Sequence, residues 1–169
     1  YYIDIFNILS DKSTSKILDK KYREAVIKVL YDNGIECDYL AQIRIHGGKK
    51  DHIDLSSANL NWNNNKIELL DWNLLSSLRV KISNGHIYNM NDFILFIPKT
   101  RKNDNEIFLS SLFWQLNFLS PRTFYTNLSF YGLEKKVIFQ ESPNKYFLQS
   151  HKRKNGPILA GNRIRIWGN

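Results

Sequence analysis

The stretch Ser77-Leu78-Arg79-Val80-Lys81-Ile82-Ser83-Asn84-Gly85 decides the fold class of this chain. Its apolar residues alternate with polar ones over 77–83, which predicts a strand with one apolar face. Asn84-Gly85 is the dipeptide most typical of a tight turn between two antiparallel strands. Phe93 to Pro98, a short apolar run, is typical of a buried strand. The stretch therefore predicts a sheet that is mainly antiparallel.

The segments on either side predict helices beside this sheet. Between Lys16 and Asn33 the apolar residues recur at helical spacing, which predicts an amphipathic helix packed on the sheet and ended by Asn33-Gly34. The other predicted elements are strands over 40–45, 124–130 and 135–140 and helices over 104–118 and 144–151. Together they predict an α+β fold, a mainly antiparallel sheet with flanking helices.

The composition is that of a folded chain with a basic surface. Hydrophobic residues make up 43% and aromatic residues 14% of the 169 residues, enough for one domain with a packed core. No apolar run approaches the roughly 20 residues that span a bilayer. The net charge of +8 favours an anionic partner, and a solvated basic surface is the equal alternative. Without an RNA-binding or zinc-finger pattern, nucleic acid is a possible but not a favoured partner.

The few cysteines and histidines limit metal chemistry. Cys37 is the single cysteine, which excludes a disulfide within the chain and leaves too few thiols for an ordinary structural zinc site. His46 and His52 lie near Asp51 and Asp54, a set that can bind a metal but is more often a polar turn between strands. We therefore predict no metal site in this chain.

Three cations on predicted strands suit a phosphate site. Arg44 and Arg79 alternate with apolar neighbours on separate strands, and a strand arginine can bind phosphate or carboxylate through two hydrogen bonds. Lys81 follows Arg79 by two residues, so both side chains point to the same face of the sheet. The alternative is an ordinary exposed strand face.

Two carboxylates have positions that suit a nucleotide site. Glu106 falls in the first turn of the predicted helix, where the helix dipole favours an acid. In kinase-like sites a strand lysine pairs with a helix glutamate and orients the nucleotide phosphates, which makes Lys81 and Glu106 a candidate pair. Glu141 ends an apolar strand, where the nucleotide-binding hinge of a two-lobed enzyme lies. The alternatives are a simple helix-end acid and a simple strand end.

The order and spacing of these segments resemble the CotH kinase family of atypical kinases. Arg44 to Gly47 with His52 looks like the first strand motif of that family, Ser77 to Lys81 resembles its lysine-containing strand, and Phe93 to Arg101 matches its Pro-Lys-x-Arg strand. The later matches are Phe118-Leu119-Ser120-Pro121, Tyr131-Gly132, Val137 to Glu141 and Lys145 to Leu148. The ordered series, covering residues 38–160, carries the resemblance.

The resemblance implies the N-terminal, nucleotide-binding part of a phosphotransferase. The cofactors would be ATP and Mg²⁺, and the phosphate acceptor a protein hydroxyl or a surface polymer. Arg79 and Lys81 would contact phosphate, Glu106 would orient Lys81, and Glu141 would lie near the adenine. The catalytic aspartates of the second lobe have no counterpart in this chain.

The chain also departs from the family pattern. Leu75-Ser76 stands where the family has a lysine pair, and Tyr131 replaces an asparagine. We expect residues 1–37 to form an N-terminal segment with the amphipathic helix, and residues 38–169 to form a kinase-like domain that is truncated at its C-terminus and inactive by itself. The alternative function is a degenerate kinase-like module that binds an anionic glycan, nucleic acid or protein.

Overall fold

The computed structural model describes residues 21–47, 53–54, 60–63, 66–69, 75–130 and 133–158. The elements in chain order are β1 (Arg23–Leu30), β2 (Glu36–Ile45), β3 (Ile53–Asp54), β4 (Leu60–Asn63), β5 (Lys66–Leu69), β6 (Leu75–Ser76), β7 (Leu78–Ile82), β8 (Asp92–Phe96), the 3-10 helix η2 (Pro98–Arg101), α2 (Asp104–Gln115), β9 (Thr123–Phe130), β10 (Leu133–Glu141) and α3 (Lys145–Ser150).

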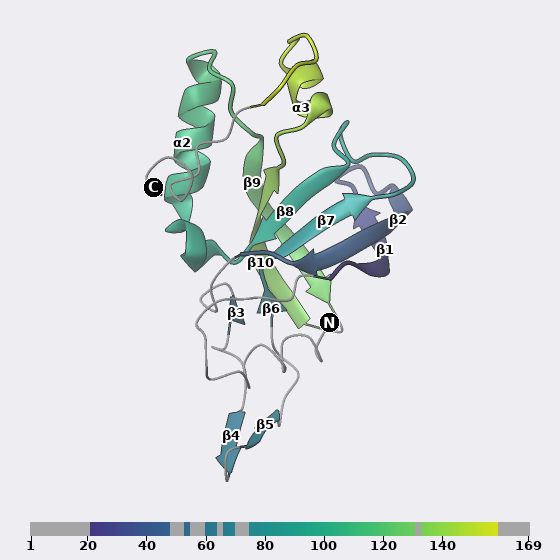
Figure 1. The fold of residues 1–169 in the computed structure, drawn as a ribbon, viewed down its shortest axis with the longest axis vertical. Helices are drawn as coiled ribbons and strands as arrows, with labels where there is room; N and C mark the ends of the chain where they lie inside the picture. The colour runs from purple at the N-terminus through teal and green to yellow at the C-terminus, as the bar shows by residue number, and fades with distance from the viewer. Residues whose placement is uncertain are drawn as a thin grey trace, which may run out of the picture.

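Six strands form one curled sheet in the order β1-β2-β7-β8-β10-β9 (Figure 1). Each neighbouring pair in it is antiparallel. β3 pairs with β6, and β4 pairs with β5, as separate two-stranded sheets. The α+β class and the mainly antiparallel sheet are thus confirmed.

The core lies on the face of the sheet to which every second residue points. Leu78, Val80 and Ile82 of β7 are all buried there, as the alternation predicts. They pack with buried side chains from the adjoining strands β2, β8 and β10. The remaining buried members of this cluster are Ala41, Ile87, Met90, Phe93, Leu95, Val137 and Phe139. The opposite face carries the candidate cations on β2 and β7, and on β8 and β10 it carries the buried side chains of the register partners Phe96 and Ile138.

The helix predicted over residues 16–33 is wrong for the part that the structure describes. Residues 23–30 form β1, which pairs with β2. Ala25, Ile27 and Val29 point toward the core and alternate with exposed residues, so the period is two rather than 3.6. Isoleucine and valine are stiff at χ1, which favours a strand over a helix. The expected division of the chain at residue 37 falls within β2.

Asn33-Gly34 ends this strand instead of a helix. Gly34 has a φ of +81° and donates a backbone hydrogen bond to Tyr31 O at 2.8 Å. Tyr31 N in turn donates to Ile35 O at 2.9 Å. The residues therefore form the turn between β1 and β2, which is the other structure that an Asn-Gly pair favours.

The predicted turn at Asn84-Gly85 is the start of a longer connection, residues 83–91, between β7 and β8. Gly85 has a φ of +97°, and Asn84 accepts a hydrogen bond from Leu40 N at 2.6 Å through Oδ1. Ile87 and Met90 form an isolated bridge and are buried in the core cluster. The hairpin is thus confirmed, but its loop also supplies two core residues.

The two helices that the structure describes lie beyond the β9 and β10 side of the sheet (Figure 1). α2 confirms the helix predicted over 104–118, and α3 confirms the one over 144–151. Asn144 caps α3, because its Oδ1 accepts hydrogen bonds from the backbone N of Tyr146 and Phe147. The predicted strands over 40–45, 124–130 and 135–140 are confirmed as β2, β9 and β10.

Candidate functional site

The three predicted cations lie on one face of the sheet. Arg44 of β2 is the register partner of Arg79 of β7. Lys81 is two residues further along β7, opposite Gln42. Because residues that face each other across a strand pair share a face, Arg44, Arg79 and Lys81 all project from the side opposite the core. The shared face of Arg79 and Lys81 is therefore confirmed.

Tyr22 brings two of these cations together. The guanidinium carbon of Arg44 lies 5.2 Å from the centre of the Tyr22 ring, and Lys81 Nζ lies 5.0 Å from it. Each contact contributes about 0.5–1 kcal/mol at a partly exposed site. Neither cation forms an ion pair with a carboxylate in the part of the chain that the structure describes. Both charges thus remain available to an anion.

The sequence did not indicate Tyr22. This residue precedes β1 by one position, and the helix predicted over this segment gave no strand register that would relate it to Lys81. A period of two through Ala25, Ile27 and Val29 would have put residues 22, 24 and 26 on the face opposite the core. That alternation was the signal that could have located Tyr22.

Arg79 has a carboxylate partner. Its Nε donates to Asp92 Oδ1 at 3.0 Å and its Nη2 to Asp92 Oδ2 at 2.8 Å. Ser142 Oγ also donates to Asp92 Oδ1, at 2.9 Å. The hydrogen bonds to Asp92 raise the pKa of Arg79 above its usual value, against the opposing effect of burial. A phosphate would have to compete with Asp92 for this guanidinium, so Arg79 is a weaker candidate ligand than Arg44 and Lys81.

Glu106 interacts with the sheet and not with Lys81. Gln140 Nε2 donates to Glu106 Oε1 at 2.7 Å and to Thr123 Oγ1 at 3.4 Å. Gln140 on β10 is the register partner of Ile94 on β8, and Ile94 is the register partner of Arg79 on β7. Gln140 therefore lies two strand spacings, of about 4.8 Å each, from β7. That separation explains why Lys81 and Glu106 do not pair. Glu106 lies on the same face of the sheet as the cations, but over β10 and not over β2 and β7.

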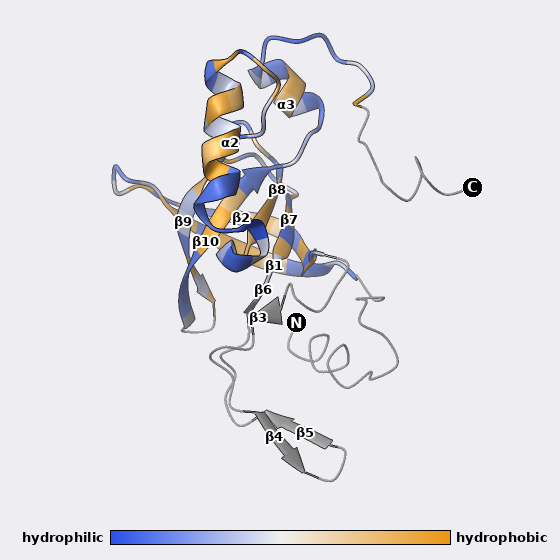
Figure 2. Cartoon of the chain, turned by 90° about the vertical axis from the view of Figure 1, so that its left-hand side faces the viewer, coloured by the Kyte–Doolittle hydropathy of each residue, from blue (hydrophilic) through white to orange (hydrophobic). Residues whose placement is uncertain are grey.

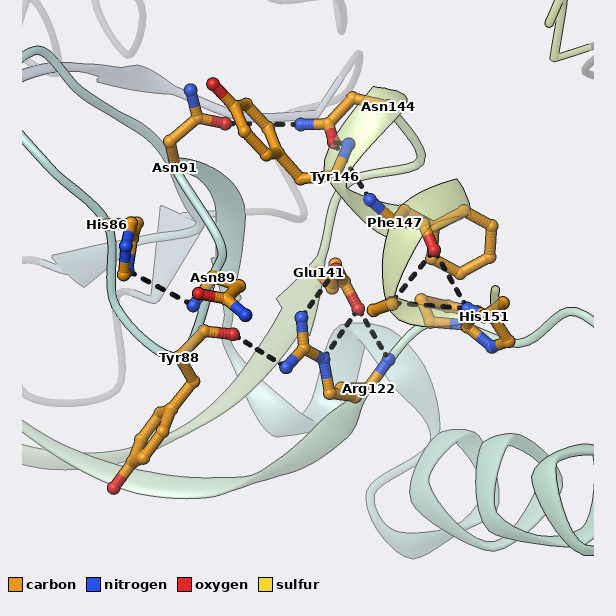
Figure 3. A network of polar contacts seen from close by, with 12 residues as sticks. His86, Tyr88, Asn89, Asn91, Arg122, Glu141, Asn144, Tyr146, Phe147 and His151 are labelled. Atoms are coloured by element: carbon orange, nitrogen blue, oxygen red, sulfur yellow. Dashed lines mark hydrogen bonds and ion pairs between the residues drawn. The ribbon is translucent and has the colours of Figure 1, made fainter. Parts of the chain in front are cut away.

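Glu141 points to the other face of the sheet. It is 2% exposed and pairs with Arg122, whose Nη2 donates to Oε1 at 2.8 Å and whose Nε donates to Oε2 at 2.9 Å (Figure 3). Arg122 Nη1 also donates to the backbone O of Tyr88 at 2.8 Å. The pair therefore ties the start of β9 to the end of β10 and to the β7–β8 loop. Of the five predicted site residues, Glu141 is the one separated from the cations by the sheet itself.

The described residues offer no metal centre. No group of three His, Cys, Asp or Glu side chains within them is arranged to hold an ion. Asp51 and His52, from the cluster considered in the sequence, lie outside the described residues, as does the predicted hairpin turn Tyr131-Gly132. None of the helices in the described part of the chain has both the length and the apolar character needed to cross a membrane.

Comparison of the chain with known proteins gives no match among protein-family models, curated proteins or solved structures. The site must therefore be interpreted from its own chemistry. Two cations without carboxylate partners, held over one aromatic ring on an open sheet face, can bind an anion that reaches both.

Proposed function

We propose that the chain is the N-terminal, nucleotide-binding portion of a CotH-like phosphotransferase, which would transfer phosphate from ATP to a protein hydroxyl. The observation that carries this proposal is the placement of Arg44 and Lys81 over the Tyr22 ring. A strand lysine is also one of the groups with which kinase-like sites hold nucleotide phosphates.

The residues present fit the phosphates of ATP better than they fit its metal ion. Arg44 and Lys81 supply two positive charges from adjacent strands, and Lys81 is exposed. Mg²⁺ prefers oxygen ligands from one or two carboxylates and the phosphates themselves, and the carboxylate that lies opposite Lys81 in the described residues, that of Asp92, is already bound by Arg79. ATP would supply the phosphoryl group, and the chain's own residues would bind and orient it.

The second candidate is a kinase-like module that binds an anionic polymer without catalysis. Two contacts favour this candidate. Asp92 accepts hydrogen bonds from the guanidinium of Arg79, and Glu106 accepts one from Gln140, so neither residue is bonded as a kinase site requires. A kinase-like lysine–glutamate pair is thus absent from the described residues, and the net charge is +8. Polymer binding of this kind weakens steeply as salt rises, since it releases counterions.

Direct competition separates the two candidates. A fluorescent ATP analogue is bound to the chain and displaced with ATP, with inorganic triphosphate or with heparin, at low and high salt. The phosphotransferase proposal predicts that ATP displaces the analogue better than triphosphate does, because the base adds contacts. Displacement by heparin alone, lost at high salt, would support the polymer-binding module instead.

A further inference from the structure

α2 leaves most of its apolar side chains exposed to solvent. Ser110 is the single buried residue of this helix, and its Oγ donates to Thr123 Oγ1 at 2.9 Å. Glu106, one turn earlier, accepts the hydrogen bond from Gln140. Residues four apart lie on one side of a helix, so Glu106, Ser110 and Trp114 share a side, and half-buried Ile107 lies next to them. The contact of α2 with the sheet is therefore small and partly polar. A helix packed on a sheet usually buries a continuous apolar stripe, and α2 does not.

The outward side forms a large apolar ridge. Positions 108, 109, 112, 113 and 116 follow the spacing of one helix face, and the turn after the helix continues it. The exposed side chains of this ridge, between 37% and 65% accessible, are Phe108, Leu109, Leu112, Phe113, Leu116, Phe118 and Leu119. Figure 2 shows the hydrophobic colour running along α2. An exposed apolar surface of this extent marks an interaction site.

Basic residues lie at both ends of this ridge. Lys99 and Lys102 are exposed just before the N-terminus of α2. At the other end the Trp114 ring lies 4.6 Å from the ring of His151, which is followed by the exposed Lys152-Arg153-Lys154. The two views of the molecule agree that α3 and this basic turn lie beside the C-terminal end of α2 (Figures 1 and 2). The ridge is therefore apolar along its length, with a basic turn beside its C-terminal end and with lysines next to Asp104 at its N-terminal end.

We propose that this ridge binds the surface of an anionic lipid bilayer. Aromatic and leucine side chains would enter the boundary between headgroups and acyl chains, and the flanking lysines and arginine would contact anionic headgroups. The aliphatic half of the ridge argues against a single-stranded nucleic acid, because leucine offers no ring on which a base can stack. The basic turn at residues 152–154 argues against a parallel contact with a second copy, because like charges would meet there.

The test uses the whole chain and vesicles of two compositions. Flotation with phosphatidylcholine vesicles is compared with flotation in vesicles of phosphatidylcholine mixed with phosphatidylserine. We expect strong binding to the mixed vesicles, weak binding to phosphatidylcholine alone, and a reduction by added salt. Absence of binding to the mixed vesicles would overturn the proposal.

A matched pair of double variants identifies the surface. Phe108→Gln with Leu116→Gln alters the ridge, and Val26→Gln with Leu40→Gln removes two equally exposed apolar residues from β1 and β2. All four side chains are exposed, so both proteins should fold, which circular dichroism checks. The ridge variant should bind the mixed vesicles about tenfold more weakly or worse, and the control should bind like the wild type. Equal losses would refute the assignment, as would self-association of the wild type that the ridge variant abolishes.

Discussion

Arg79 and Asp92 form a two-point ion pair across adjacent strands, with Nε to Oδ1 at 3.0 Å and Nη2 to Oδ2 at 2.8 Å. The pair lies on the face that carries Arg44 and Lys81, and it removes the third predicted cation from the set available to an anion. Asp92 is only 14% exposed at its side chain, and it also accepts from Ser142. The pair therefore has both a structural and an electrostatic consequence.

Asp92→Asn tests both consequences. The amide cannot accept both guanidinium hydrogen bonds as a carboxylate does, so we expect a loss of about 1–3 kcal/mol in the free energy of unfolding. Arg79 would then be free to join Arg44 and Lys81, and anion affinity should rise. Urea unfolding and ATP titration measure the two effects, and a variant that lost stability and bound ATP less well would contradict the second.

The buried pair Arg122–Glu141 should be more important to stability than any exposed ion pair. Removing one partner leaves an uncompensated buried charge, so Arg122→Met should cost about 3–5 kcal/mol. Lys28→Met is the control, since Lys28 pairs with Glu36 at 3.2 Å between side chains that are more than half exposed. Its expected cost is small, because an ion pair between exposed side chains is screened by water. Denaturant unfolding measures the loss in the free energy of unfolding for both variants. Equal losses would contradict the burial of the Arg122–Glu141 pair.

Tyr31 should titrate at unusually high pH. Burial, and then the hydrogen bond with Tyr39 at 2.9 Å, raise the pKa of Tyr31 to about 12. The folded state thus favours the neutral phenol, and this contribution to stability is complete below pH 10 and is lost as the pH rises from 10 to about 12. The difference in phenolate absorbance between wild type and Tyr31→Phe isolates this group. Tyr39→Phe should lower its pKa, and a Tyr31 that titrates near 10 would contradict the structure.

Gly34 should resist substitution although there is space for a side chain. A Cβ at Gly34 would meet nothing within 4 Å, but the φ of +81° is unfavourable for any residue with a Cβ. Gly34→Ala should therefore cost about 1 kcal/mol or more of stability. Gly156→Ala is the matched control, because its site is equally open and its φ lies outside that region. Thermal unfolding should separate the two, and a neutral Gly34→Ala would argue against the turn between β1 and β2.

The sequence predicted elements well where one periodicity was unambiguous. β7 alternates strictly, and α2 and α3 follow helix-start signals such as Asn144, so these were correct. Residues 23–30 fit both a helical and a strand period. There the helical prediction was wrong, because pairing with β2 and packing of the half-buried Ile27 and Val29 against the core favour the strand. Tertiary contacts of this kind override local preference.

The candidate site was predictable only in part, for a related reason. Alternation along one strand placed Arg79 and Lys81 on the same face. The partners Tyr22, Asp92 and Arg122 depend on strand register and on contacts between separate elements, which no local pattern encodes. The structure consequently changes the expected set of nucleotide ligands. Arg44 and Lys81 are the strongest candidates, because Arg79 is bonded to Asp92 and Glu141 is bonded to Arg122.

The measurement that tests the central claim most directly is a calorimetric titration of ATP with Mg²⁺ into the wild type, Lys81→Ala and Lys136→Ala. Lys136 is the matched control, because its Nζ also lies over a tyrosine ring, 4.0 Å from the centre of Tyr125. We predict that Lys81→Ala weakens ATP binding by about tenfold, or about 1.4 kcal/mol, and that Lys136→Ala leaves it unchanged. Absence of ATP binding by the wild type, or equal losses in both variants, would contradict a nucleotide site at Tyr22, Arg44 and Lys81.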